Sequence, residues 1–112
     1  MRVLHPLPAL DRPDYPLLPR HFDEARGVIE AARGEGGRAL IYCLQGVNRS
    51  AALSVAYLVD RGECDLLGAV ARVARARGRV LTNRGFRKQL VEFARERDRL
   101  GGVDIRLTRR LT

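Results

Sequence analysis

The sequence has few of the residues that build disulfide frameworks or metal centres. Its two cysteines, Cys43 and Cys64, are too sparse for a secreted disulfide scaffold. No Cys-x2-Cys pair or nearby histidine gives them zinc-ligand spacing, so we expect no metal and no cofactor. Reduced cysteines favour a cytoplasmic protein, with the nucleus as a second location.

Long apolar runs and aromatic residues are also scarce. No run is long enough to cross a bilayer, and prolines interrupt the N-terminal stretch where a signal core would lie. We therefore expect a non-secreted protein without a transmembrane segment. Aromatic residues make up 5% of the chain and no DNA- or RNA-reading motif is present, so we expect no specific nucleic-acid partner.

What is present is a basic chain with enough apolar residues for one small domain. The 112 residues are 46% hydrophobic and carry a net charge of +8, almost entirely from arginine. This charge favours anionic partners such as phosphates, nucleic acid or acidic membrane surfaces. The densest arginines lie between residues 72 and 88, and we interpret them mainly as the solvated face of helices.

The spacing of apolar residues predicts an α/β domain. Short strands over residues 2–10 and 38–43 are interspersed with helical patterns, which favours a small, mostly parallel central sheet flanked by helices. A proline-rich loop over residues 11–19 follows the first strand. The predicted helices cover residues 20–32, 49–61, 65–77 and 83–100.

The turn between the second strand and the second helix carries the candidate chemistry. If Arg49 opens a helix, the backbone N–H groups just before it lack intrahelical partners and form an anion-binding cradle. Gly46 gives this turn the freedom to adopt a tight conformation. The predicted phosphate-binding residues are Leu44, Gln45, Gly46, Val47, Asn48 and Arg49.

Three side chains around this turn are candidates for catalysis. The cradle and the Arg49 guanidinium should lower the pKa of the Cys43 thiol below its ordinary value and make the thiolate a nucleophile toward phosphorus. Ser50 is placed to hydrogen-bond that thiolate when it acts as a leaving group. A Cys-x5-Arg spacing is weak evidence in an arginine-rich chain, and a buried structural cysteine is the competing interpretation.

The surrounding sequence resembles a known family. The segment YCLQGVNRSAALSVAYL closely resembles the signature of the cysteine-based dual-specificity phosphatases, in which His-Cys-x5-Arg-Ser precedes Ala-x3-Ala-Tyr-Leu. RHFDEARGVIEAARGEGGRALIYC resembles the segment before the nucleophile, and LLGAVARVARARGRVLTNRGFRKQLVEF resembles the closing helices. The resemblance implies a small, atypical member with a phosphotyrosine protein phosphatase-like fold, its catalytic domain over residues 1–102 and a tail over 103–112.

The resemblance also implies two-step hydrolysis of a phosphoester through a phosphocysteine on Cys43. In this family the general acid is an aspartate on an upstream loop. Asp11, 32 positions before Cys43, is the candidate and Asp14 is its rival, while either could instead be a turn former beside Pro13. Asn83 is expected to brace the acid loop against the phosphate loop, to cap the last helix, or both.

Two departures from the family pattern bear on activity. Tyr42 stands where a histidine usually precedes the nucleophile, which predicts reduced rather than abolished activity. The family domain normally opens with a helix and two strands before the segment matching residues 2–10. We therefore expect an N-terminally truncated domain with uncovered sheet edges.

The leading hypothesis is a protein phosphatase for phosphotyrosine, and also for phosphoserine and phosphothreonine if the pocket is shallow. Phosphoproteins and anions such as phosphate or sulfate are the expected ligands, and the same chemistry would serve a phosphoinositide or an RNA phosphate. The alternative is a catalytically weak module that binds phosphoproteins. Tyr42 and the missing N-terminal strands favour it, and the retained Cys43, Arg49, Ser50 and Asp11 oppose it. A third hypothesis, an arginine-rich nucleic-acid binder, predicts salt-dependent affinity.

Overall fold

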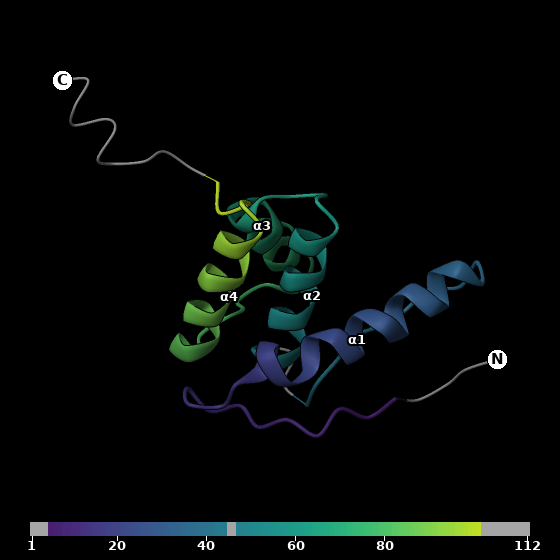
Figure 1. Cartoon of the computed structure of the whole chain (residues 1–112). Helices are drawn as coiled ribbons and strands as arrows, with labels where there is room; N and C mark the ends of the chain where they lie inside the picture. The colour runs from purple at the N-terminus through teal and green to yellow at the C-terminus, as the bar shows by residue number, and fades with distance from the viewer. Residues whose placement is uncertain (1–4, 45–46, 102–112) are drawn as a thin grey trace, which may run out of the picture.

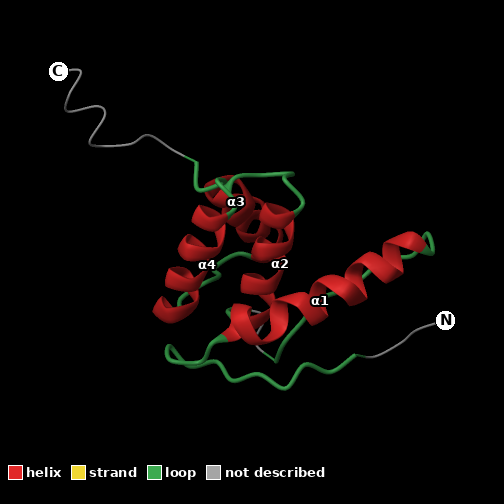
Figure 2. Cartoon of the chain, in the orientation of Figure 1, coloured by secondary structure: helices red, strands yellow, loops and turns green. Residues whose placement is uncertain are grey.

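The computed structural model describes residues 5–44 and 47–101. Within this part of the chain the regular structure consists of four helices joined by loops (Figures 1 and 2). The helices are α1 (Leu17–Gly34), α2 (Arg49–Asp60), α3 (Leu66–Arg77) and α4 (Arg84–Glu96). All four predicted helices are therefore present, with ends that differ by a few residues.

Helix α2 is the centre of the bundle. It contacts each of the other three helices, whereas α1 and α3 do not contact each other. Its sequence is rich in alanine and valine, which lets neighbouring helices approach from several sides. The C-terminal half of α1 extends beyond the other helices, so only part of α1 is covered (Figure 1).

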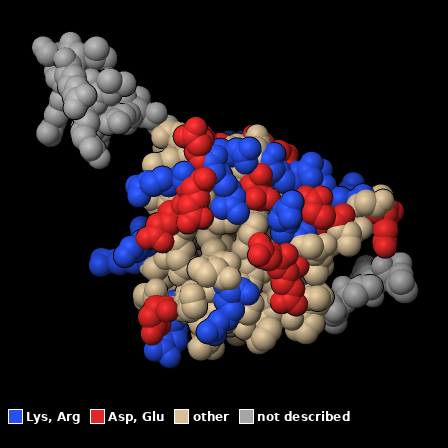
Figure 3. All heavy atoms as spheres, viewed as in Figure 1, with Lys and Arg blue, Asp and Glu red and all other residues tan. Residues whose placement is uncertain are grey.

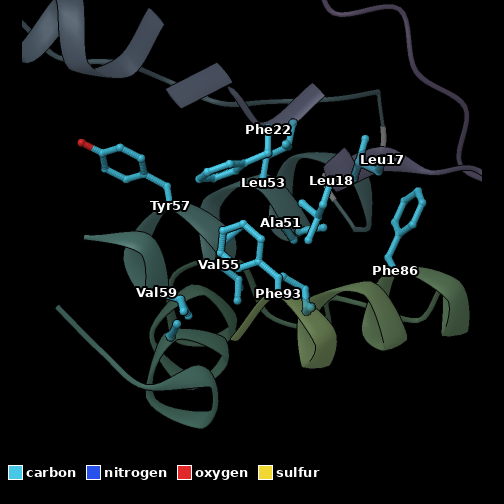
Figure 4. Close-up of a cluster of buried hydrophobic side chains, with 14 of the residues drawn as sticks. Leu17, Leu18, Phe22, Ala51, Leu53, Val55, Tyr57, Val59, Phe86 and Phe93 are labelled. Carbon is cyan, nitrogen blue, oxygen red and sulfur yellow. The ribbon is translucent and has the colours of Figure 1, made fainter. Parts of the chain in front are cut away.

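The core forms where α1 and α4 close over α2 (Figure 4). Phe22 and Phe93 meet edge to face with their ring centroids 4.7 Å apart, a favourable aromatic geometry. Phe86 is fully buried at the start of α4. The guanidinium of Arg97 lies 3.5 Å from the centroid of the Phe93 ring and also hydrogen-bonds Asp60, which ties α4 to the end of α2.

Local capping explains where α3 and α4 begin and end. The side chains of Asp65 and Asn83 accept hydrogen bonds from the backbone N–H groups of Gly68 and Phe86, at 2.8 and 3.1 Å. Gly78, at φ +84°, ends α3 in a conformation that other residues rarely adopt. Helix α4 ends four residues before the predicted residue 100, because the chain turns through Asp98 at φ +54°.

The expectation of a central sheet is not met in the described residues. Residues 38–43 form no strand, and the side chain of Leu40 is 81% exposed rather than buried. Residues 5–10 of the first expected strand are also coil, and residues 2–4 lie outside the described residues. A strand requires hydrogen bonds to a neighbouring strand, and the described chain places no such partner beside residues 38–43.

The surface mixes both signs of charge. Figure 3 shows basic and acidic side chains interspersed over one face of the molecule. Several form ion pairs between helices, such as Arg26 with Asp60 and Arg61 with Glu30. No helix in the described part of the chain is long and apolar enough to span a membrane.

Candidate active site

The candidate nucleophile lies beside the first turn of α2, as the sequence predicts. Helix α2 begins at Arg49, and Cys43 is half-buried rather than sealed in the core. The Sγ atom of Cys43 lies 3.2 Å from the Oγ atom of Ser50, within hydrogen-bond range. Ser50 itself is almost completely buried, at 1% exposed, which holds its hydroxyl in place.

Arg77, the last residue of α3, adds a second contact to Ser50. Its Nη1 atom donates a hydrogen bond to Ser50 Oγ at 2.6 Å, and its Nη2 atom donates to the carbonyl oxygen of Ile41 at 2.7 Å. One guanidinium therefore bridges α2 and the segment that carries Cys43. From the sequence we interpret the arginines of this region mainly as a solvated face. Arg77 is exposed, in agreement with that interpretation, and it makes these two hydrogen bonds as well.

Asn48, just before α2, fixes the candidate general acid. Its side-chain N–H donates to Asp11 Oδ2 at 2.9 Å, while its Oδ1 atom accepts from the backbone N–H of Asn83 at 2.9 Å. The side chain of Asn83 donates to Asp11 Oδ1 at 2.8 Å. Each carboxylate oxygen of Asp11 thus accepts one amide hydrogen bond, from two residues that are themselves joined.

Arg49 keeps part of its hydrogen-bonding capacity unused. Its Nη1 atom donates to the carbonyl oxygen of Ala9 at 3.0 Å, which attaches the acid loop to the start of α2. Its Nε atom is fully buried and has no hydrogen-bond partner. A buried guanidinium N–H without an acceptor is costly, and it is suited to an anion that supplies the missing oxygen.

The loop that carries Asp11 is also attached to α4. Gln89 accepts a hydrogen bond from the backbone N–H of Leu18 at 3.0 Å and donates to the carbonyl oxygen of Tyr15 at 2.7 Å. Gly85 lies so close to Pro13 that a Cβ atom at this position would overlap the Pro13 carbonyl. The lack of a side chain at Gly85 therefore lets the acid loop rest directly on α4.

The remaining residues of the predicted phosphate cradle, and the rival aspartate, differ in exposure and in hydrogen bonding. Leu44 is 92% exposed, and the carbonyl oxygen of Val47 accepts a hydrogen bond from the N–H of Leu81 at 2.8 Å. Gln45 and Gly46 lie outside the described residues, so their part in the predicted cradle stays a prediction. Asp14 is exposed and pairs with Arg12 at 3.3 Å, away from the asparagines that hold Asp11.

Sequence reasoning did not assign Arg77 or Gln89 to the site. Both act through contacts with residues 27 to 74 positions away, so spacing along the chain does not reveal their partners. For Gln89 a signal existed, because the segment NRGFRKQL, which resembles part of the family's closing helices, also contains Asn83 and Gly85 on the side of α4 that receives the acid loop.

Together these groups form a candidate cysteine-based phosphoryl-transfer site. The half-buried thiol of Cys43 lies at the start of a helix beside the hydroxyl of Ser50. Arg49 has a buried N–H without a hydrogen-bond partner, and the carboxylate of Asp11 is held on a separate loop. These are a nucleophile, an anion-binding group and an acid, the parts that such chemistry needs.

Comparison with known proteins gives the family. Residues 7–96 match the family model described as "Dual specificity phosphatase, catalytic domain". The chain therefore belongs to the dual-specificity phosphatase family.

Similar sequences occur in several vertebrate phosphatases. Human protein phosphatase Slingshot homolog 3 is 43% identical over 74 residues, which is 66% of this chain and 11% of the relative. Dual specificity protein phosphatase 22 of Xenopus tropicalis is 36% identical over 89 residues, covering 80% of this chain and 42% of the relative. The chain thus spans less than half the length of these relatives.

Solved structures of the family also resemble the chain. Human DUSP28 superposes with a TM-score of 0.75 at 34% identity, over 81% of this chain and 61% of that chain. The human tyrosine phosphatase-like serine/threonine/tyrosine-interacting protein gives 0.74 at 28% identity, over 81% and 60%. The helical arrangement is therefore that of the phosphatase fold, although the described residues lack a sheet.

Proposed function

We propose that this chain is a protein phosphatase that hydrolyses phosphotyrosine, together with phosphoserine and phosphothreonine, through a phosphocysteine on Cys43. The observation that carries the proposal is the arrangement around the start of α2. Cys43 and Ser50 lie there in hydrogen-bond contact, and Asn48, immediately before the helix, holds Asp11. Family membership supports this proposal, because phosphocysteine chemistry is general to the family.

In the first step the Cys43 thiolate attacks phosphorus. The S–P bond forms and the bond from phosphorus to the leaving oxygen breaks, while protonated Asp11 gives its proton to that oxygen. Arg49 binds two of the phosphoryl oxygens, using the fork geometry of its guanidinium. The positive end of the α2 dipole stabilises the bound dianion.

In the second step water hydrolyses the phosphocysteine. The water oxygen bonds to phosphorus, its proton passes to the Asp11 carboxylate, and the S–P bond breaks with its electron pair on Sγ. The hydroxyl of Ser50, 3.2 Å from Sγ, donates a hydrogen bond to the departing thiolate. Inorganic phosphate leaves, and Asp11 is again protonated for the next cycle.

We also propose that residues 38–43 form a strand of a small parallel sheet when a neighbouring strand is available. The exposed Leu40, Tyr42 and Leu44 alternate with the half-buried Ile41 and Cys43, as in a strand with one covered face. Because the chemistry needs a reduced thiol, we place the protein in a reducing compartment, the cytoplasm or the nucleus.

A second candidate function is a module that binds phosphoproteins without turning them over. Tyr42 favours it, because its ring replaces the family's histidine and its hydroxyl makes no hydrogen bond with a described residue. Similarity to a protein described as tyrosine phosphatase-like and interacting also favours it.

One experiment separates the two functions. Wild type and Cys43→Ser are assayed with an aryl phosphate and with a panel of phosphopeptides, phosphoinositides and 5′-phosphorylated RNA. We expect turnover and a phosphoenzyme that can be trapped by rapid denaturation in wild type and neither in Cys43→Ser, with phosphopeptides as the preferred substrates. Binding of phosphopeptide by both proteins without turnover in either would reject the phosphatase and leave the binding module.

A further inference from the structure

Arg77 connects the segment that precedes Cys43 to helix α2. Residues 38–43 form no strand, so no sheet ladder holds the segment that delivers Cys43. The Nη2 atom of Arg77 donates to the carbonyl oxygen of Ile41, two residues before Cys43, at 2.7 Å. Its Nη1 atom donates to Ser50 Oγ at 2.6 Å. The guanidinium is planar and rigid, so these two contacts fix the segment against α2.

The contact with Ser50 also determines what the serine hydroxyl can do. Arginine has only donors, so Ser50 Oγ must accept from Arg77 and keeps its single hydrogen for another partner. Cys43 Sγ lies 3.2 Å from this oxygen. The neighbouring hydroxyl, Ser54, donates instead to the backbone carbonyl of Ser50, at 2.8 Å. The hydrogen of the Ser50 hydroxyl is thus available to Sγ, and the guanidinium that donates to Oγ polarises the hydroxyl.

We infer that Arg77 is a positioning residue for the nucleophile: it holds Cys43 against α2 and orients the Ser50 hydroxyl to stabilise the thiolate. The inference rests on the proposed function and names a component of the same site. Arg77 acts through its hydrogen bonds to Ser50 and Ile41. The other charged groups of the site are Arg49 and Asp11, which are left unchanged in the test.

The test measures Cys43 directly. In a Cys64→Ser background, the rate of Cys43 alkylation by iodoacetamide is followed against pH, which reports thiolate formation without any phosphate chemistry. We expect Arg77→Ala to move the midpoint of this profile to higher pH and to slow aryl phosphate turnover about tenfold, as expected for one charge-assisted hydrogen bond. Arg75→Ala is the matched control, because Arg75 lies on the same helix, is exposed and makes no hydrogen bond with a described residue.

A double-mutant cycle tests the route through Ser50. We expect Arg77→Ala to slow turnover less in a Ser50→Ala background than in wild type, because part of its effect is already lost. Equal losses in both backgrounds, or an alkylation profile of Arg77→Ala that coincides with that of Arg75→Ala, would overturn the inference.

A conservative variant covers the case in which Arg77→Ala does not fold. Arg77→Lys keeps the charge but cannot bridge Ser50 and Ile41 with a rigid fork, so we expect its alkylation midpoint to lie above that of wild type. A folded Arg77→Lys protein with the wild-type profile would overturn the inference. If wild type lacks turnover while the alkylation profile still depends on Arg77, the proposed function fails and the positioning role stands.

Discussion

The two sides of Cys43 along the chain differ sharply in how they are held. On the C-terminal side, α2 is buried among the other helices, and Ser50 is 1% exposed. On the N-terminal side, Leu40 and Tyr42 are 81% and 68% exposed, beside an open hollow of about 580 Å³ between α1, α2 and residues 36–41. The difference follows from hydrogen bonding, because a helix satisfies its own backbone whereas an extended segment needs a neighbour.

This comparison shows that the site depends mainly on helices. Asp11 is held through Asn48 before α2 and Asn83 before α4, and Cys43 contacts Ser50 within α2. The extended segment carries Cys43, and the hydrogen bonds described here from Cys43 and Ile41 lead to Ser50 and Arg77 on the helices. Changes on the helical side should therefore affect the protein more than changes in residues 38–44.

The largest expected effect is the loss of stability when a core residue is truncated, compared with truncation of an exposed residue. Phe86 is fully buried between α4 and its neighbours, so Phe86→Ala should lower the free energy of unfolding by about 3–5 kcal/mol. Leu40→Ala, at an exposed position, should change it by no more than about 0.5 kcal/mol. Urea unfolding followed by circular dichroism measures both. A large loss for Leu40→Ala would mean that residues 38–43 are covered in solution.

A second prediction separates the two aspartates of the acid loop. Asp11→Asn should slow turnover of substrates with poor leaving groups about 100-fold and should affect good leaving groups less. Because asparagine cannot donate a proton to the leaving oxygen, the loss should grow as the leaving group becomes poorer. Asp14→Asn is the control, since Asp14 is exposed and, among the described residues, pairs with exposed Arg12. A larger, leaving-group-dependent loss of kcat/KM in Asp14→Asn would assign the acid to Asp14.

A third prediction concerns the contact between the acid loop and α4. Gly85→Ala places a methyl group on the Pro13 carbonyl and should displace Asp11, lowering turnover by up to about 100-fold. Gly27→Ala on α1 is the matched control, because no atom lies within 4 Å of its added methyl group. Steady-state kinetics and thermal melting of both variants test this. Unchanged turnover in Gly85→Ala would show that the loop is not held by this contact.

The smallest expected effect concerns the pH-dependent ion pair between Glu30 on α1 and Arg61 just after α2. The hydrogen bond from Arg61 lowers the pKa of Glu30 from its ordinary value of 4.5. The carboxylate therefore stabilises the fold above that value, and this contribution is lost as pH falls through the lowered pKa. Glu30→Gln should melt slightly below wild type at neutral pH and should match it in acid. A difference that persists unchanged in acid would contradict this sign.

The helices, and the position of Cys43 beside the start of α2, could be predicted from sequence because their signals are local. The glycines after residue 33 end α1, the apolar spacing after Arg49 marks α2, and Asp65 and Asn83 cap the next two helices. The predicted strand at 38–43 is not formed in the described residues, because an apolar run indicates a tendency to be buried but not the presence of a neighbouring strand.

The sequence by itself placed Cys43 and Ser50 near the start of the same helix, since only six residues lie between them and α2 begins at Arg49. The tertiary structure decided which aspartate faces the asparagines and that Arg77 bridges Ser50 and Ile41. Those contacts join residues 27 to 72 positions apart. Their distances depend on how helices pack, which chain spacing does not encode.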